Sequence, residues 1–455
     1  MGISRRNFIK GSSSLFATLA ASGLLRPSVS MAQASVGNNR NAIFIFWRGG
    51  RDGFYTLPYF SGPVEGALAP LRPNISVSPG SIISEGSFNT AQNGISDKIG
   101  FHPDWDNLRN VSGTNVLAEH AHILKSIGTL QYMGGSHEEK TRIWHDGDHV
   151  QQSVAAQGWF ARLIERANMS SFQAWGIGNF GQDMRFNVLD GDKPTLIRNI
   201  NEFNYETRNI YYMGSGTGSS DDSRHSMEVA RQMLALTPIS NPTVKRFKEN
   251  AQLTHDTVPT MTAVNGLSTV GSYPSGNFGS QCRDAAKLLM AKRSGMLGAE
   301  FVNLPQIIML EIGGMDTHGN QVNSLGSGDG TIDVVSRALA ALFTDLLPNS
   351  NNGFQNIFAD TVVCDYSEFG RTVRENGGFG TDHGWASNMA VFGGSVRPGV
   401  SGSAPSLSNI ANSNRFTANL CFMSHIMATM SWLGIPNVNS IFPELTPPPP
   451  ITLFT

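Results

Sequence analysis

The sequence predicts an α/β protein whose doubly wound, largely parallel central sheet is flanked by helices. Short apolar runs typical of buried strands recur at 42–47, 306–312 and 361–364. Amphipathic helical patterns lie between strand patterns, the alternation that produces parallel sheets. Each of the three runs also breaks directly into a loop rich in glycine and charge. Ligands of open α/β sheets bind at the carboxyl ends of strands, so these loops are where chemistry is expected.

The composition is that of an ordinary globular protein. The chain has 455 residues, of which 40% are hydrophobic and 15% charged, enough for a large core. Its three cysteines lie far apart, which excludes a disulfide scaffold. The formal net charge is −2; removing the four positive charges of residues 1–34, which carry no acid, leaves −6 for the remainder. A mildly acidic body argues against nucleic acid as a partner.

The N-terminus resembles a twin-arginine export signal. Arg5 and Arg6 are followed by Phe8 and Lys10, then by a weakly apolar stretch over 11–25 and small-x-small cleavage patterns over 30–34. The apolar stretch is shorter than the roughly 20 residues that span a bilayer. We therefore expect 1–34 to be removed, and the mature chain, which has no predicted transmembrane segment, to be periplasmic or secreted.

The rest of the chain predicts one large domain over 35–445 and a proline-rich tail over 446–455. Further strands are expected at 121–130 and 387–392, and the expected helices are 103–110, 151–165, 282–296, 331–347 and 416–433. His425 is expected to pack within the last of these helices. Signals weaken between about 168 and 280, where we expect a helical or irregular cap insertion with helices at 223–236 and 242–252.

A histidine-rich stretch over 137–149 needs separate consideration. His145 and His149 have the i, i+4 spacing of a zincin pair, but Asp146 and Gly147 follow where a zincin requires glutamate. A self-contained zinc helix is therefore disfavoured. The stretch instead predicts a loop that enters a helix, whose N-terminus favours an anion.

Acids and histidines follow the predicted strands and would meet at one edge of the sheet. The candidate metal ligands are Asp52, Asp316, His318, Glu368, Asp382 and His383. Four carboxylates and two imidazoles suit zinc, manganese, magnesium or calcium, with one or two ions. The alternative is that these residues only cap turns and helices.

Four blocks carry a resemblance to a known family: Gly-Gly-Arg-Asp-Gly (49–53), Gly-Gly-Met-Asp-Thr-His (313–318), Ser-Glu-Phe-Gly-Arg-Thr (367–372) and Gly-Thr-Asp-His (380–383). Together they resemble the exported "domain of unknown function 1501" family, which is itself similar to the alkaline phosphatase and sulfatase superfamily. The resemblance implies an alkaline-phosphatase-like α/β fold with a metal site at the sheet edge, and hydrolysis of phosphate or sulfate esters.

Residue by residue, the resemblance implies that Asp52 holds a second metal. It implies that Asp316 and His318 hold the first, which His383 closes. Two departures follow. Phe369 stands where the superfamily has a metal-binding histidine, so one ion of a pair would be missing or weakly held. The superfamily's nucleophile has no clear counterpart.

Ser136, Thr141 and water activated by the metal are the candidate nucleophiles. Arg371 is expected to neutralise the oxyanion, and His145 to act as acid, base or orienter.

The expected function is thus an exported metal-dependent hydrolase of phosphate or sulfate esters, acting on a small-molecule or polymer substrate. The alternative is a non-catalytic binding or surface-assembly protein that retains the fold with a degenerate metal site. No haem, iron–sulfur or dinucleotide motif supports a redox role.

Overall fold

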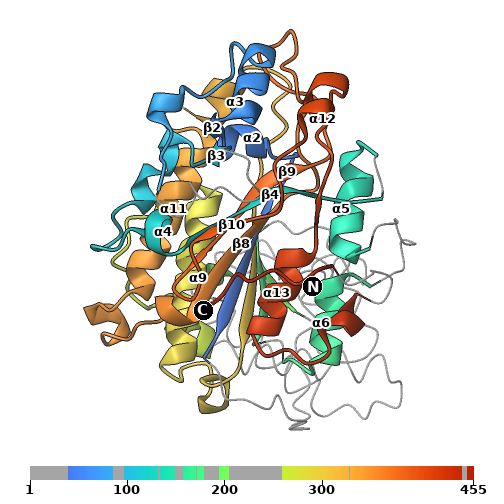
Figure 1. Ribbon diagram of the computed structural model, residues 1–455. Coiled ribbons are helices and arrows are strands. Elements are labelled where there is room, and N and C mark those ends of the chain that lie inside the picture. Colours follow the sequence, from blue (N-terminus) through green and yellow to red (C-terminus); the bar gives the residue numbers. More distant parts are fainter. Residues whose placement is uncertain are drawn as a thin grey trace, which may run out of the picture.

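The computed structural model describes residues 39–85, 97–131, 134–148, 157–170, 172–178, 194–203, 259–326, 328–442 and 448–455. Within them, a nine-stranded sheet has the order β10-β4-β9-β8-β1-β7-β5-β6, with β11 beside β4 (Figure 1). Its strands are β1 (Asn41–Trp47), β4 (Ala121–Gly128), β5 (Ala174–Ile177), β6 (Thr195–Ile197), β7 (Gln306–Ile312), β8 (Thr361–Tyr366), β9 (Ser387–Gly393), β10 (Gly399–Ser401) and β11 (Leu420–Cys421). Because β9 alone among them runs antiparallel to its neighbours, the largely parallel sheet is confirmed.

Strand β1 forms the centre of the sheet. Its alternate residues serve opposite faces: Ile43 and Ile45 belong to one hydrophobic core, Phe44 and Phe46 to the other. A strand buried on both faces must be apolar throughout, and this is the reason the run stands out in the sequence.

Helices cover both faces of the sheet (Figure 1). On one side lie α9 (Asn277–Arg293) and α11 (Thr331–Leu346); on the other lie α5 (His137–Asp146), α6 (Trp159–Arg166) and α13 (Ser424–Trp432). In α11, Ile332, Val335, Leu339 and Leu342 are buried at helical spacing, which gives the helix its apolar stripe. The doubly wound prediction is therefore confirmed.

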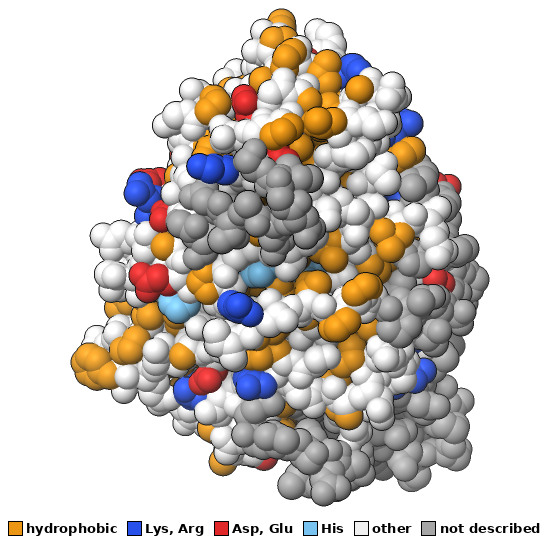
Figure 2. Space-filling model, viewed as in Figure 1, with side chains coloured by type: hydrophobic (Ala, Val, Ile, Leu, Met, Phe, Trp, Pro, Cys, Tyr) orange, Lys and Arg blue, Asp and Glu red, His pale blue; other side chains and the backbone are white. Residues whose placement is uncertain are grey.

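Several smaller elements surround the sheet. They are α2 (Gly53–Thr56), α3 (Pro63–Leu68), α4 (Val116–Glu119), α10 (Gln321–Leu325), α12 (Leu407–Asn412) and the antiparallel pair β2 (Tyr59–Ser61) and β3 (Lys98–Ile99). No helix among the described residues combines the length and the hydropathy needed to cross a membrane. On the face shown in Figure 2, charged side chains are sparse and scattered among apolar ones.

Several predicted boundaries differ from the structure. The loop expected around His145 is the helix α5, which contains good helix formers and ends where Gly147 adopts a left-handed φ of 69°. The last predicted helix is shorter than 416–433, because β11 first pairs with β4 before α13 begins.

The predicted cap overlaps the sheet. Strands β5 and β6 fall within 168–280, yet they extend the main sheet beyond β7. The predicted helices at 223–236 and 242–252 and the predicted signal at 1–34 lie outside the described residues, and both stay predictions. In the tail, Leu453 is buried in the second core and its carbonyl accepts a hydrogen bond from Arg397 N at 2.7 Å, so the end of the chain packs on the domain.

His425 packs inside α13, as predicted. The ring is fully buried, and because the Asp365 carbonyl can only accept, Nε2 donates to it at 3.0 Å. Burial lowers the pKa of His425 to about 4.

His425 should therefore make folding acid-sensitive. Its folded pKa lies below its unfolded value of about 6.5, so its neutral form stabilises the fold above pH 6.5, and this contribution is lost as the pH falls toward 4. Urea unfolding of the mature chain in chelator, from pH 7 to pH 4, should show His425→Gln losing about 3 kcal/mol less stability than the wild type. An unchanged pH slope would contradict this role; buried His102, with its pKa also lowered by burial to about 4, supplies part of the slope that remains.

Candidate metal centre

The loops after β1, β7 and β8 leave the sheet at the same edge. These strands are parallel and in register, with Trp47 opposite Ile312 and Phe46 opposite Tyr366. Strand β4 runs in the same direction, because β9 is antiparallel to both β8 and β4. The segment after β4 therefore also reaches this edge, where it enters α5 at His137.

A buried guanidinium holds these loops together. Arg371 is fully buried, and its Nε donates to Gly50 O at 2.6 Å. Its Nη2 donates to Met315 O at 2.8 Å and also to Gly49 O, while Nη1 donates to Thr381 O at 3.1 Å. One side chain thus satisfies backbone carbonyls from the loops after β1, β7 and β8.

Close approach of these loops requires glycine. Gly49 has a φ of 115°, and a Cβ there would lie 2.6 Å from the backbone nitrogen of Asp316. A Cβ on Gly50 would lie 2.0 Å from the ring of Phe369. The Gly-Gly pair after β1 is therefore needed for packing against the other two loops.

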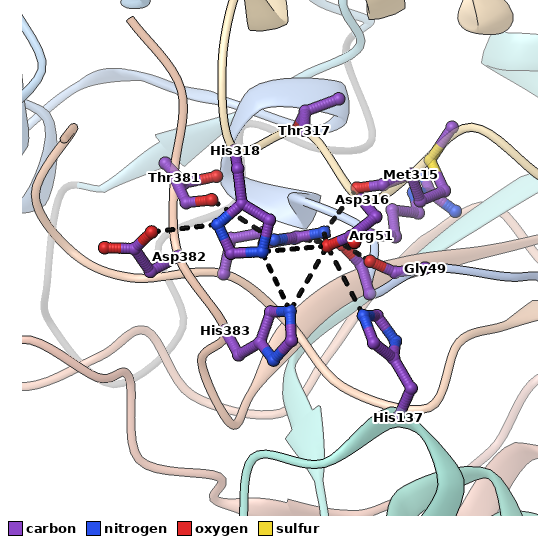
Figure 3. Close-up of polar contacts among 12 residues, drawn as sticks. Gly49, Arg51, His137, Met315, Asp316, Thr317, His318, Thr381, Asp382 and His383 are labelled. Carbon is purple, nitrogen blue, oxygen red and sulfur yellow. Dashed lines mark hydrogen bonds and ion pairs between the residues drawn. The ribbon is translucent and has the colours of Figure 1, made fainter. Parts of the chain in front are cut away.

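Three imidazoles converge on the carboxylate of Asp316 (Figure 3). Its Oδ1 lies 3.4 Å from Nε2 of His137, 3.1 Å from Nε2 of His318 and 3.2 Å from Nε2 of His383. The ligand atoms of His137, Asp316 and His383 all lie within 4.8 Å of one another. Nε2 of His318 lies 3.0 Å from Nε2 of His383, so a fourth donor adjoins this group.

The opposite nitrogen of each ring is fixed by an acceptor. Nδ1 of His137 lies 2.9 Å from a carboxylate oxygen of Glu368, and Nδ1 of His318 lies 2.9 Å from one of Asp382. Nδ1 of His383 lies 2.6 Å from the carbonyl of Gly135. Because carboxylates and carbonyls accept, each Nδ1 carries the proton. With Nδ1 donating outward, the ring nitrogen that faces Asp316 in each case is Nε2, the atom that would bind a cation.

This arrangement fits a cation. Nε2 of His137 is buried without a hydrogen bond, and a cation at the centre would give it a partner. Donors at about 2.0–2.1 Å from a tetrahedral zinc ion stand about 3.4 Å apart, close to the 3.0–3.4 Å separations observed between Nε2 atoms and Asp316 Oδ1 and between the two neighbouring Nε2 atoms. Imidazoles held by carboxylates and a carbonyl are also the usual outer arrangement of zinc sites.

The electrostatics keep the central carboxylate ionised. Burial alone would raise the pKa of Asp316, but the hydrogen bond and charge of Arg371, with His137 and His318, lower it to about 2. Hydrogen bonds from Asn376 and His318 lower the pKa of Asp382. The hydrogen bond to Glu368 raises the pKa of His137. An anionic centre ringed by nitrogen donors is therefore present before any ion binds.

The predicted ligands fall into three groups. Asp316, His318 and His383 come together at the centre. Asp382 and Glu368 lie one step outside it: they hold His318 and His137 instead of facing the central space.

Asp52 lies elsewhere. It caps α2, is fully buried, and accepts from Arg72 Nη1 at 2.9 Å and from Gln321 Nε2 at 2.8 Å, so its negative charge is already compensated. The second-metal role expected for Asp52 is not supported by its contacts.

Two predicted catalytic residues occupy other places. Arg371 is buried among backbone carbonyls and therefore organises loops instead of facing a substrate oxyanion. His145 is buried against Phe46, with ring centroids 5.1 Å apart, and lies eight residues after His137 on α5. This separation is about 12 Å along a helix axis.

The central residue that the sequence prediction missed is His137. It follows β4 and the Gly134-Gly135 pair, which is the same order of strand, glycines and ligand seen after β7. That pattern could have identified it.

Phe369 packs against two of the imidazoles. Its ring centroid lies 4.8 Å from those of His137 and His383, and the side chain is buried. The residue that replaces an expected ligand thus packs against two of the rings.

Substitutions of His137 and His145, which both lie on α5, should distinguish a metal ligand from a core residue. His137→Gln should weaken zinc binding by more than about 100-fold, since it removes a donor nitrogen. His145→Gln, in the same helix, should change the affinity by less than about threefold. Zinc content and chelator competition of the purified mature chain measure both, and equal losses in the two variants would contradict the assignment.

Replacing Arg371 should destabilise the loops at the carboxyl edge of the sheet. In Arg371→Lys the ammonium cannot reach carbonyls of three loops, so the metal-free protein should lose about 3 kcal/mol or more of unfolding free energy. Arg374→Lys is the matched control, because Arg374 is only half-buried and donates to the Ser413 and Ala411 carbonyls at 3.3 and 3.2 Å. Urea denaturation in chelator measures the difference; similar midpoints for the two variants would refute the organising role.

Comparison with known proteins identifies the family. The family model described as "Protein of unknown function (DUF1501)" matches residues 39–431. Among solved structures, the chain is similar to a mutant of the alkaline phosphatase PafA, with a TM-score of 0.31 and 10% sequence identity. That match covers 76% of this chain and 65% of the PafA chain, and a likeness at this score carries no argument about activity. No curated protein matches. Since the family model covers most of its length, the chain belongs to the DUF1501 family.

Proposed function

We propose that the chain is an exported, metal-dependent hydrolase of phosphate or sulfate esters. The observation that carries the proposal is the convergence of three Nε2 atoms on Asp316, each ring held by an acceptor at Nδ1. The export part rests on the Arg5-Arg6 pattern, and the ester class rests on the resemblance of the four sequence blocks.

The donor set favours one ion of the zinc type. Three imidazole nitrogens and one carboxylate suit zinc or a similar transition metal, whereas magnesium and calcium prefer all-oxygen sites. When bound, such an ion supplies Lewis-acid polarisation of a phosphoryl or sulfuryl oxygen. His137, Asp316, His318 and His383 would hold it.

The side chains of the centre leave one side open to solvent. Asp316 and His318 each expose 48% of their side chains, whereas Glu368 behind them is buried. A substrate can therefore approach from the exposed side, while Glu368 keeps His137 aligned from below.

Among the predicted nucleophiles, Ser136 is the best placed. It is the N-cap of α5, is exposed, and makes no side-chain capping bond. The residues on either side of it, Gly135 and His137, both contact the centre. The N-terminus of α5 would also favour the anionic group of an ester. Thr141 is buried one turn further along the helix.

The alternative is a binding or assembly protein with a reduced metal site. It is favoured by the loss of a second ion site, because Asp52 is paired with Arg72 and Phe369 occupies a ligand position. A metal would then stabilise a recognition surface without turnover.

Hydrolysis measurements distinguish the two functions. Zinc-loaded mature protein should hydrolyse at least one class among aryl phosphates, phosphodiesters and aryl sulfates. His383→Ala should lower kcat/KM by more than about 100-fold, because a ligand is lost, and Ser136→Ala should lower kcat while zinc remains bound. Arg374→Lys serves as the control with unchanged turnover. Full zinc occupancy without turnover on any substrate would support the binding protein instead.

A further inference from the structure

Several hydrogen bonds fix a short loop, residues 376–380, beside the metal centre. Asn376 N donates to Gly380 O at 2.9 Å, and the Asn376 side-chain oxygen accepts from Gly378 N at 2.9 Å. The amide nitrogen of the same side chain donates at 3.0 Å both to the His318 carbonyl and to Asp382. The loop over 376–380 is therefore tied to two residues of the centre.

The loop is also fixed to the segment that carries His318. Asn320 N donates to Gly378 O, and Gln321 N donates to Phe379 O, each at 2.9 Å. A Cβ on Gly380 would lie 2.4 Å from the Thr317 carbonyl oxygen, so a larger residue at this position would clash with the segment that carries His318. These contacts place the backbone of Phe379 directly beside the exposed His318.

Phenylalanine is energetically unfavourable at position 379. Its φ is 58°, in the left-handed region that a bulky side chain rarely adopts, and its ring is 58% exposed. The residues around it, Gly377, Gly378 and Gly380, are all glycine, so glycine would suit the backbone better. Strain that neighbouring contacts enforce is concentrated at functional sites. Val322, which follows Gln321 on α10, is a second exposed apolar side chain.

We infer that Phe379 determines substrate specificity by contacting the alcohol side of the ester. This inference rests on the proposed function: the acidic group of the ester would bind at the metal centre, and Phe379 would contact an aromatic ring attached to it. The substrate class is therefore a phosphate or sulfate ester whose alcohol part is an aromatic ring, since contact between two aromatic rings is favourable.

The chain contains a matched control. Phe354 also has a left-handed φ, 57°, and is 72% exposed after a glycine. It precedes β8 and thus lies at the amino edge of the sheet, opposite the carboxyl edge that holds the metal centre. Phe354→Gly relieves the same kind of backbone strain without altering the loop beside the centre.

The test measures, by calorimetry, how tightly zinc-loaded protein binds phenylphosphonate and methylphosphonate. The unfolding midpoint of each variant is measured as well. The wild type should bind phenylphosphonate about tenfold more tightly than methylphosphonate. Phe379→Gly should abolish this preference, leave methylphosphonate affinity unchanged, and keep or raise the unfolding midpoint. Phe354→Gly should keep or raise the midpoint and retain the preference.

The possible failures can be told apart. Binding of both phosphonates with an unchanged preference in Phe379→Gly would overturn the inference and leave the metal centre intact. A marked fall in the midpoint of Phe379→Gly would also overturn it, since the ring would then serve folding. Binding of neither phosphonate by zinc-loaded wild type would overturn the proposed function and the inference with it.

Discussion

The buried guanidinium of Arg371 is the contact on which the rest of the carboxyl edge depends. A buried cation is costly unless its donors are matched, and here they meet carbonyls from separate loops and the carboxylate of Asp316, 2.6 Å away. The same contacts satisfy carbonyls that would otherwise be buried without partners. Arg371 thus fixes the backbone and also positions and ionises the central acid. The sheet supplies the direction of the loops, and this side chain determines their spacing.

The acids at this edge have different roles. Asp316 is half exposed and faces the imidazoles, whereas Glu368 and Asp382 hold rings from outside and Asp52 is compensated by Arg72. An imidazole that donates from Nδ1 to a carboxylate is a more basic donor at Nε2 and has less freedom to turn. Four carboxylates near one another therefore do not imply four ligands. Most of them serve the backbone or the rings, and only one serves the centre.

The sequence was sufficient for the parts that depend on local pattern. Strands β1, β7 and β8 are apolar because both faces are buried, and their parallel order brings Asp316, His318 and His383 to one edge. It was insufficient where side-chain partners come from remote positions. No pattern in the sequence around Asp52 predicts that Gln321, 269 residues away, is its hydrogen-bond partner. The role of His137 likewise depends on Glu368, 231 residues later, which no local pattern around His137 indicates.

The centre is arranged before an ion binds, and this links metal affinity to folding. Glu368, Asp382 and the Gly135 carbonyl hold the imidazoles, and Phe369 packs against two of them, so little ordering remains for binding to accomplish. Three imidazole nitrogens and a carboxylate face one another in the metal-free fold. Since the unfolded chain does not assemble these donors, the free energy of binding a cation to them adds to the stability of the fold. Metal binding and the folding of the carboxyl edge are therefore thermodynamically linked. A fold that must be complete before the ion is held is also compatible with an export route that carries folded proteins, which is the route the N-terminal arginine pair predicts.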